Sequence, residues 1–251
     1  MNEQEYLEYK RKNRLAKKNQ PVVEDELVEF IPSPNFSSRR NHNIDMIVIH
    51  YTGANRIAST LDWFQRKESQ VSSHYIIGRD GRTVQMVQDE QKAWHAGYSY
   101  WDGGYNLNKN SIGIELVGTD GIEFTNYQYE SLISLCFNLI NKHEIPLTRI
   151  VGHEHISGYK VETALNAKGY HCSYKVDPGE KFDWTFFIGQ LELALDEEKR
   201  ISEAEPVQSV NKKEIDIYQP QLNMNTGVTN FDKGLVSAIL DFLSKILGVK
   251  L

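Results

Sequence analysis

The sequence is poor in cysteine and carries no excess of positive charge. Two cysteines, Cys136 and Cys172, occur among 251 residues, so we expect no disulfide framework and a protein suited to a reducing compartment. Cys136 lies within an apolar helical pattern and is expected in the core. The net charge of −6 argues against a nucleic-acid-binding protein, whose binding surface is usually basic. Nucleic acid is therefore not among the partners that we expect.

Signals for export and for membrane insertion are also lacking. The N-terminal residues contain no apolar core like that of a secretory signal, and no segment approaches the length of a transmembrane span. We therefore expect a protein that is cytoplasmic as synthesised and has no transmembrane segment. If it acts beyond the cytoplasm, another system must deliver it.

The length and the hydrophobic content of 40% suffice for one core of roughly 150 residues with appendages. We expect a charged N-terminal arm over residues 1–31, a folded domain over residues 32–199 and a polar linker over residues 200–230. Residues 231–251 repeat leucine and isoleucine at helical spacing, which predicts an amphipathic C-terminal helix. Its apolar stripe suits docking on the chain's own domain or self-association into a homo-oligomer, and membrane-interface binding ranks third.

Hydrophobic patterns in the folded domain alternate between those of strands and those of helices. Strands are expected at residues 45–50, 73–78, 83–87, 112–117 and 149–155, and helices at residues 59–68, from Thr125 and from Asp183. Either Ser59 or Thr60 is expected to cap the first helix. Thr125 is expected to cap the second, in a capping box with Gln128. This order predicts an α/β fold with a mixed central β-sheet flanked by α-helices.

Three residues at strand ends or in an extended turn are candidate metal ligands. His50 ends a buried strand and His153 follows the apolar start of another, where ligands gather in open sheets. Pro178 favours an extended Asp177, which places Lys175 on the same side of the chain. Catalytic zinc takes three such ligands and keeps a fourth position open. The plainer alternatives are structural histidines and a local salt bridge between Lys175 and Asp177.

Glu115 is an acidic residue in the middle of a strand that is otherwise apolar. Within residues 111–116, Ile112, Ile114 and Leu116 share one face, and Glu115 lies on the other. A buried carboxylate is costly unless it is paired, hydrogen-bonded or used in chemistry. Beside a metal-activated water it would be suited to the role of general base.

Three motifs in order carry a resemblance to a known family: Ala93-Trp94-His95-Ala96-Gly97, Ser111-Ile112-Gly113-Ile114-Glu115-Leu116 and Lys175-Val176-Asp177-Pro178-Gly179. The chain resembles the zinc N-acetylmuramoyl-L-alanine amidases over roughly 150 residues, from about Ser33 to Trp184, and is most similar to the anhydro-muropeptide subgroup. That family also includes phage amidase-lysozymes and peptidoglycan recognition proteins. The resemblance implies their fold, a Zn²⁺ cofactor and a peptidoglycan or muropeptide substrate.

The resemblance also implies a role for each catalytic residue. His50, His153 and Asp177 would hold the zinc ion. Glu115 would act as the general base toward the attacking water, and Lys175 would stabilise the negative charge that develops on the amide oxygen. The bond cut would be the amide between the lactyl group of N-acetylmuramic acid and L-alanine.

By the same analogy, Trp94, His95 and Asn108 would line the substrate groove, and Tyr51 is a further candidate for substrate binding because it adjoins His50 close to the metal. For Tyr51, simple packing is the alternative. His74 recurs near the site in similar proteins, but a packed structural role is at least as consistent with the sequence.

The stretch between His153 and Asp177 departs from the family pattern, because its 23 residues exceed the usual spacing. An insertion around residues 162–174, or 156–174 at its widest, is expected to loop out. It contains Cys172, the rival third ligand, since some family members use cysteine there. His155 is a weaker rival if the strand continues through it.

Two other classes of function remain open. Some relatives bind peptidoglycan without cutting it, so a recognition module is the main alternative to an enzyme. A structural protein that assembles through residues 231–251 is another alternative, but it would leave the three candidate metal ligands unexplained. Within the enzyme class, the sequence is consistent with recycling of soluble anhydro-muropeptides or with lysis of polymeric wall after delivery by a holin or a secretion machine.

Overall fold

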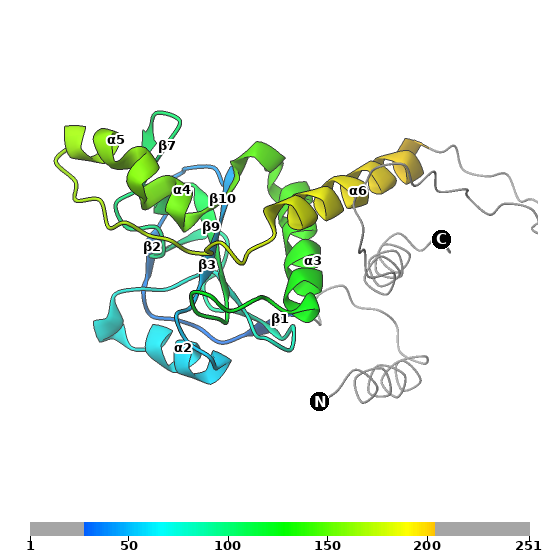
Figure 1. Ribbon diagram of the computed structural model, residues 1–251, viewed down its shortest axis with the longest axis horizontal. Coiled ribbons are helices and arrows are strands. Elements are labelled where there is room, and N and C mark those ends of the chain that lie inside the picture. The colour runs from blue at the N-terminus through cyan, green and yellow to red at the C-terminus, as the bar shows by residue number, and fades with distance from the viewer. Residues whose placement is uncertain (1–27, 204–251) are drawn as a thin grey trace, which may run out of the picture.

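A six-stranded sheet forms the centre of the computed structural model, which describes residues 28–203. Its strand order is β1-β5-β4-β9-β3-β10. The strands are β1 (Val28–Phe30), β3 (Met46–Tyr51), β4 (Tyr75–Ile77), β5 (Thr83–Gln85), β9 (Ser111–Leu116) and β10 (Ile150–Gly152). Strands β4, β9, β3 and β10 run parallel, and β5 pairs antiparallel with β4. The predicted α/β fold with a mixed central sheet is therefore confirmed (Figure 1).

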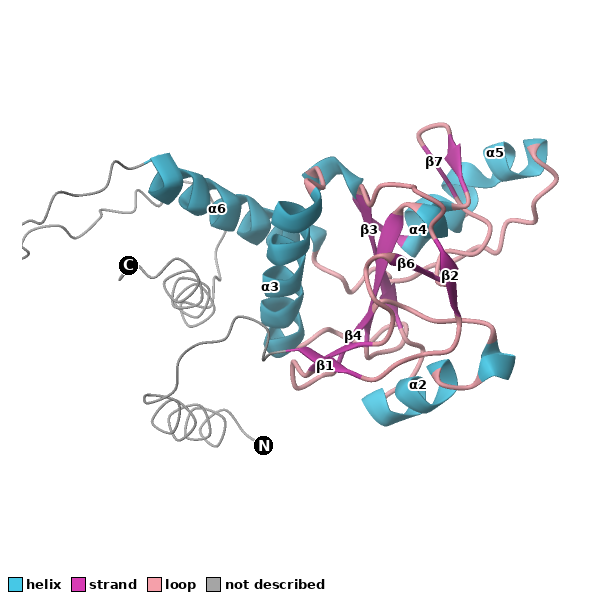
Figure 2. Ribbon diagram, turned by 180° about the vertical axis from the view of Figure 1, so that it is seen from behind, coloured by secondary structure: helices cyan, strands magenta, loops and turns pink. Residues whose placement is uncertain are grey.

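Helices cover both faces of this sheet (Figure 2). The long helices α3 (Asn126–His143) and α6 (Trp184–Glu203) pack together on one face. Helix α2 (Ile57–Phe64) and the short helix α4 (His153–Ser157) contribute to the core of the other face. The smaller elements are α5 (Glu162–Ala167), the 3₁₀ turns η2 (Lys67–Ser69), η3 (Leu107–Lys109), η4 (Leu147–Arg149) and η5 (Tyr159–Val161), and the strand pairs β2 (Phe36–Ser38) with β6 (Gln91–Ala93) and β7 (Tyr100–Trp101) with β8 (Gly104–Tyr105).

The alternation of side chains along β3 assigns the two faces of the sheet. Ile47 and Ile49 are fully buried in the core beneath α3 and α6. Met46 and Val48 point to the opposite face, where they pack in a second buried cluster. Successive side chains of a strand point to opposite faces, so His50 follows Met46 and Val48 onto the second face. The candidate site therefore lies on the face away from the long helices.

The capping box predicted at the start of α3 is confirmed. The backbone nitrogen of Gln128 donates to the Thr125 hydroxyl at 3.2 Å, and the Thr125 nitrogen donates to the Gln128 side chain at 3.1 Å. Cys136 is fully buried in α3, as the apolar pattern predicts. The N-terminal cap of this helix thus follows from local sequence alone.

The start of helix α2 differs from the prediction. The helix begins at Ile57 after Arg56, whose side chain forms no capping hydrogen bond, so the prediction that Ser59 or Thr60 caps it is wrong. The earlier start brings the partly buried Ile57 against the apolar cluster that contains Leu61 and Phe64. Tertiary packing here outweighs the preference for a capping hydroxyl.

The N-terminal boundary of the domain also differs. Residues 28–30 form β1, which pairs in parallel with β5 at the edge of the sheet, so the arm predicted over residues 1–31 ends before Val28. All three residues of β1 are exposed, which explains why composition gives little sign of the strand. The rest of that arm, most of the 200–230 linker and the 231–251 helix lie outside the described residues.

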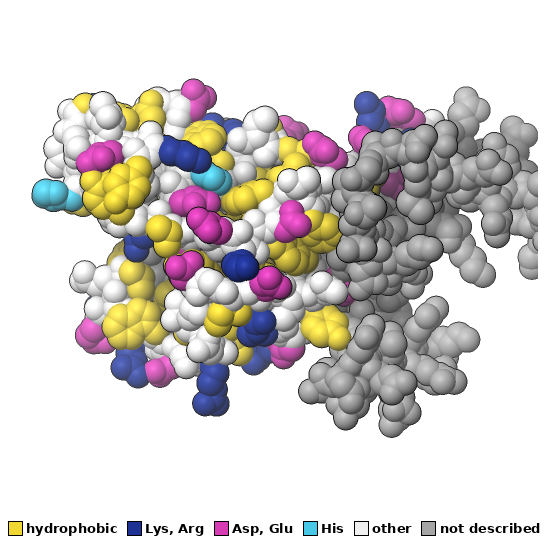
Figure 3. Space-filling model, in the orientation of Figure 1, with side chains coloured by type: hydrophobic (Ala, Val, Ile, Leu, Met, Phe, Trp, Pro, Cys, Tyr) yellow, Lys and Arg dark blue, Asp and Glu magenta, His cyan; other side chains and the backbone are white. Residues whose placement is uncertain are grey.

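The outer surface of the described part is mixed in charge. Acidic and basic side chains are interspersed on the face shown in Figure 3. Within residues 28–203, no helix combines the length and the apolar character needed to cross a membrane.

A buried carboxylate ties the end of α3 to the sheet. Asp89 accepts hydrogen bonds from the Tyr75 hydroxyl at 2.7 Å, from Lys142 at 2.9 Å and from His143 at 3.0 Å. Burial alone would raise the pKa of Asp89, but the hydrogen bonds from Lys142, His143 and Tyr75 outweigh it and hold this pKa below its ordinary value. The ionised carboxylate therefore stabilises the folded state.

Asp89→Asn is expected to lower the free energy of unfolding by about 1.5–3 kcal/mol at pH 7, because it weakens charge-assisted hydrogen bonds. The folded-state pKa is lowered, so this contribution is present above about pH 4 and is lost as the pH falls through the folded value. Urea unfolding at pH 7 and pH 3 measures both effects. The control is Glu90→Gln, which removes an exposed carboxylate 3.7 Å from the same lysine and should change little. Equal stability of the two variants at pH 7 would contradict the prediction.

Candidate active site

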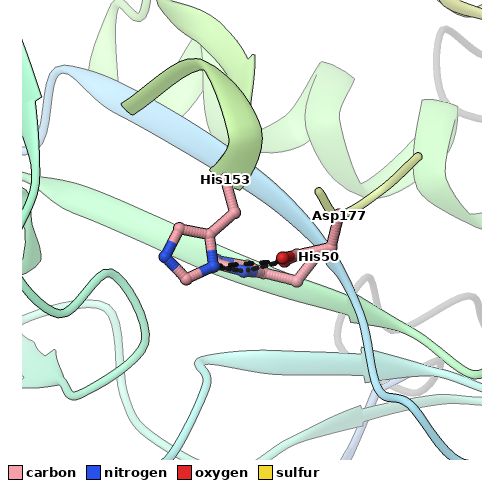
Figure 4. A group of neighbouring side chains, drawn as sticks. All are labelled: His50, His153 and Asp177. Atoms are coloured by element: carbon pink, nitrogen blue, oxygen red, sulfur yellow. Dashed lines mark hydrogen bonds and ion pairs between the residues drawn. The ribbon is translucent and has the colours of Figure 1, made fainter. Parts of the chain in front are cut away.

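Three buried side chains from separate parts of the chain meet on the second face of the sheet (Figure 4). Nδ1 of His50 lies 3.0 Å from Nδ1 of His153 and 2.9 Å from Oδ2 of Asp177, and the last two atoms are 3.1 Å apart. Among residues 28–203, this is the one group of three or more histidine, cysteine or acidic side chains arranged to hold a metal ion. The three predicted ligands are therefore brought together.

The parallel strands place two of these residues side by side. His50 lies near the carboxyl end of β3, whose neighbour β10 ends at Gly152. His153 follows at once, but it opens helix α4, so the prediction of a strand over residues 149–155 is wrong beyond Gly152. The switch from strand to helix turns the imidazole of His153 toward His50. A single-sequence pattern of apolar residues does not reveal such a switch.

Asp177 reaches the cluster through contacts with the start of α4. The backbone nitrogen of Glu154 donates to the Asp177 carbonyl at 3.0 Å. Gly152 leaves room for the next residue of the loop, because a Cβ atom at that position would lie 2.6 Å from the ring of Pro178. The third candidate ligand is thus fixed against the same strand end that presents His153.

The three donors fit zinc in number, type and spacing. Zinc–nitrogen and zinc–oxygen bonds of 2.0–2.2 Å around a tetrahedral ion place ligand atoms about 3.3 Å apart, close to the distances found here. Burial lowers the pKa of His50 to about 4, so its imidazole is neutral near pH 7. Burial alone would raise the pKa of Asp177, but the adjacent rings of His153 and His50 hold it well below its ordinary value. His50 and Asp177 are therefore in the protonation states that metal ligands need.

Glu115 lies beside the cluster without belonging to it. It pairs in register with His50 across β9 and β3, so both side chains point to the same face. One carboxylate oxygen, Oε2, is buried and has no hydrogen-bond partner. Burial, aided by the charge of Asp177 and opposed by the charge of Lys175, raises the pKa of Glu115 to about 8. A desolvated carboxyl group beside a cluster of candidate metal ligands is suited to proton transfer.

Lys175 and Tyr51 are neighbours of the cluster, but Tyr51 packs against the core beneath α3 and α6, the packing role that the sequence left open. Lys175 is exposed, yet its charge lowers the pKa of both His50 and Glu115, so its ammonium group acts on the site. Tyr51 is half-buried, and burial together with the charges of Asp120 and Asp177 raises the pKa of its hydroxyl. Lys175 is accessible from solvent, and the substrate contact predicted for Tyr51 remains a prediction.

His95 is half-buried and contacts His50 directly. Its Nδ1 lies 3.0 Å from Nε2 of His50, and its Nε2 lies 3.1 Å from the Ser111 hydroxyl. The ring fills the space above Gly113, where a Cβ atom would lie 2.5 Å from it. Ser111 and Gly113 were not predicted as part of the site, although both share the Glu115 face of β9. That shared face is the signal that could have identified them.

Trp94 and Asn108 are engaged with the protein itself. The indole nitrogen of Trp94 donates to the Ser37 hydroxyl at 3.0 Å. The side-chain oxygen of Asn108 accepts from the backbone nitrogens of His95 at 3.0 Å and Ala96 at 2.7 Å. Asn108 therefore fixes the loop that carries His95, and the substrate contacts predicted for these residues remain predictions.

Neither rival ligand lies in the cluster. The Cys172 thiol donates to the carbonyl oxygens of Ser157 and Gly158, both at 3.3 Å. Nδ1 of His155 accepts from the Gly152 backbone nitrogen at 2.9 Å. His155 does not share a face with His153, because both belong to a helix. Asp177 is the third residue of the cluster.

His74 has the structural role that the sequence allowed. It is fully buried, and its Nδ1 accepts from the Gly113 backbone nitrogen at 2.9 Å. The neighbouring Arg39 guanidinium lies 2.7 Å from Nε2 of His74 and also donates to the Ser111 carbonyl. Burial, aided by the Arg39 charge, lowers the pKa of His74 to about 3. The residue supports β9 from beneath the site.

The predicted insertion folds as a small lobe built on η5 and α5. Leu165 is fully buried, and the Tyr105 hydroxyl of strand β8 donates to the Ala164 carbonyl at 3.2 Å. The rings of Tyr98 and Tyr170 stack with their centroids 4.7 Å apart. The lobe is therefore attached to the β7–β8 hairpin.

Comparisons with known proteins agree with this geometry. The sequence model of N-acetylmuramoyl-L-alanine amidase matches residues 40–180. Two curated relatives are named 1,6-anhydro-N-acetylmuramyl-L-alanine amidase AmpD. The one from Haemophilus influenzae is 35% identical over an alignment of 184 positions, and the match covers 64% of this chain and 90% of the relative. The one from Enterobacter cloacae is 37% identical over 128 residues, or 51% of this chain and 61% of the relative.

A solved structure supports the same assignment at the level of the fold. The crystal structure of a selenomethionine AmpD derivative aligns with a TM-score of 0.54 and 28% identity, over 67% of this chain and 98% of that one. The chain thus spans nearly all of that structure but only about three fifths of the Enterobacter relative. From the matched sequence, the shared fold and the site, the chain belongs to the N-acetylmuramoyl-L-alanine amidase family of hydrolases.

Proposed function

We propose that the protein is a zinc-dependent amidase that cleaves the bond between the lactyl group of N-acetylmuramic acid and L-alanine of the stem peptide. The observation that carries this proposal is the meeting of His50, His153 and Asp177 on one buried face, with the unpartnered carboxyl group of Glu115 beside them. Family membership supports the identity of the bond that is cleaved, and the residues of the site are suited to its hydrolysis.

Each catalytic residue has a role that follows from its place. His50, His153 and Asp177 would hold the ion, which when bound polarises the amide carbonyl and acidifies a water molecule. Glu115 takes the proton from the attacking water and delivers it to the departing amine of L-alanine. Lys175, an exposed residue whose charge acts on His50 and Glu115, stabilises the negative charge that develops on the amide oxygen.

The substrate class follows from the relatives. Those named above are 1,6-anhydro-N-acetylmuramyl-L-alanine amidases, which supports soluble anhydro-muropeptides as the first candidate substrate. Polymeric peptidoglycan contains the same lactyl–alanine bond and is the second candidate. Tyr51 and Trp94 are proposed to contact the substrate on either route, together with the loop that His95 and Asn108 support.

Mass spectrometry of the products tests this proposal. Zinc-loaded protein is incubated with intact peptidoglycan and, separately, with anhydro-muropeptides, and Glu115→Gln serves as the blank. Free stem peptides that begin with L-alanine are the expected product, and the substrate that yields them identifies the biological setting. Release from neither substrate, with zinc bound, would overturn the enzyme assignment and favour a module that binds peptidoglycan without cutting it.

A further inference from the structure

A chain of hydrogen bonds runs from the back of one metal-ligand candidate to the main chain. Nε2 of His50 lies 3.0 Å from Nδ1 of His95, and Nε2 of His95 lies 3.1 Å from the Ser111 hydroxyl oxygen. That hydroxyl donates to the carbonyl oxygen of Leu107 at 2.6 Å. The chain begins on the ring atom of His50 that faces away from His153 and Asp177.

The direction of every bond follows from the last one. The Ser111 hydroxyl has a single hydrogen, and it uses this hydrogen in the bond that it donates to the Leu107 carbonyl. In the contact with His95, the hydroxyl oxygen can therefore only accept a hydrogen bond. Nε2 of His95 therefore carries a proton, and Nδ1 of the neutral ring is an acceptor. His50 must then donate from Nε2, which leaves the lone pair of its Nδ1 directed at the other two ligand candidates.

The surroundings hold the His95 ring in this position. Its backbone nitrogen donates to the side chain of Asn108 at 3.0 Å, and the ring lies against Gly113, where no side chain would fit. The plane of His95 crosses that of His50 at 83°, in an edge-to-face contact with centroids 5.1 Å apart. Rotation of the ring would break the contacts at both nitrogens.

The two candidate histidine ligands differ in this respect. His50 has a partner for its second ring nitrogen, whereas Nε2 of His153 is buried and has none in the described structure. A partner at the second nitrogen fixes which nitrogen is free to bind a metal and how the ring is oriented. The support is therefore built behind one ligand only.

We propose that His95 and Ser111 are positioning residues that set the tautomer and orientation of His50 for zinc. They act through His50 and do not touch the substrate, which replaces the groove-lining role that the family analogy suggests for His95. This inference rests on the proposed zinc site. It concerns the affinity for the ion, so it can be tested without an assay for hydrolysis.

Zinc affinity, measured by competition with a chelator, is the first test. His95→Leu fills the space but removes the acceptor, and a loss of about 10–100-fold in affinity is expected. His95→Asn places an oxygen near the position of Nδ1 and should restore most of the affinity. Ser111→Ala should give an intermediate loss. The matched control is Ser73→Ala, which removes an equally short hydroxyl-to-carbonyl bond, 2.6 Å to Gly113, outside the chain.

The visible spectrum of the cobalt-substituted protein should change in His95→Leu and Ser111→Ala but not in Ser73→Ala, because only the first two alter the orientation of a ligand. Unchanged zinc affinity and an unchanged cobalt spectrum in His95→Leu would overturn the inference while leaving the proposed amidase intact. An equal loss of affinity in Ser73→Ala and Ser111→Ala would also overturn it, since general destabilisation would then explain both.

The tautomer of His95 gives a test that does not depend on metal. Long-range ¹H–¹⁵N correlation spectra of the metal-free protein at neutral pH should show His95 protonated at Nε2 and not at Nδ1. A proton at Nδ1 would overturn the inference whether or not the protein binds zinc. If the wild-type protein failed to bind zinc at all, the proposed function would fail, and the spectra would still decide the direction of the hydrogen-bond chain.

Discussion

Glu115→Gln is expected to lower kcat by about 10²–10⁴-fold while leaving zinc affinity nearly unchanged. The amide is close in shape to the carboxyl group but cannot accept the proton of the attacking water. Glu115 lies next to the cluster and is not one of its three members, so the ion should remain bound. Steady-state kinetics on the substrate found by mass spectrometry, with zinc content measured on the same samples, checks both parts.

The pH profile gives this prediction a second observable. Burial raises the pKa of Glu115 to about 8 in the metal-free protein, and the charge of a bound cation must lower it again. The base works when ionised, so activity should fall as the pH drops through this pKa, with an acidic limb below pH 8. That limb should be absent from the residual activity of Glu115→Gln.

Glu154→Gln is the matched control for Glu115→Gln. Glu154 is a partly exposed carboxylate that senses the charge of Asp177, but its side chain contacts none of the three ligand candidates. Its replacement should change kcat less than threefold. If Glu115→Gln retained wild-type kcat, or lost zinc in proportion to activity, the role of Glu115 as a general base would be wrong.

Chelation of zinc should destabilise the domain as well as stop hydrolysis. An ion that binds the folded chain at 1,000 times its dissociation constant stabilises it by about 4 kcal/mol. For a domain of this size, that loss corresponds to a fall in melting temperature of roughly 8–16 °C. Differential scanning calorimetry with and without chelator measures the shift, and added zinc should reverse it together with the loss of activity.

Asp177→Ala provides the comparison for the chelation experiment. The variant lacks the carboxylate that contacts both His50 and His153, so neither zinc nor chelator should move its melting temperature. If the chelator changed neither the melting temperature nor the activity of the wild-type protein, the proposed zinc site would be wrong. A response of equal size in Asp177→Ala would place the ion elsewhere in the chain.

Much of the site could be predicted because its residues occupy regular positions in strands. The alternation of side chains in β9 places Glu115 opposite the apolar residues, and the apolar run before His50 marks a strand buried on both faces. The grouping of the three ligand candidates came from the motifs of the family, since spacing alone left a structural histidine or a local salt bridge equally open. The structure brings all three together.

The remaining features depend on contacts between distant segments. His95 and His50 are 45 residues apart in sequence, and their hydrogen bond exists because the loop after β6 folds over Gly113. Helix α2 begins two residues before its candidate capping hydroxyl because packing decides its start. The switch from β10 to α4 at His153 likewise leaves no periodic signal, since too few residues lie on either side of it.

One hydrogen bond described above makes the geometry of the site independent of the length of the segment between His153 and Asp177. The Glu154 nitrogen holds the Asp177 carbonyl, so the third ligand candidate is anchored next to the second although 23 residues separate His153 from Asp177. Residues 158–174 can therefore lengthen, shorten or exchange without moving the cluster. A one-residue insertion in β3 or β9 would instead turn His50 or Glu115 to the opposite face. Changes in substrate specificity can therefore arise in the lobe without disturbing the cluster, whereas insertions in the strands would disrupt it.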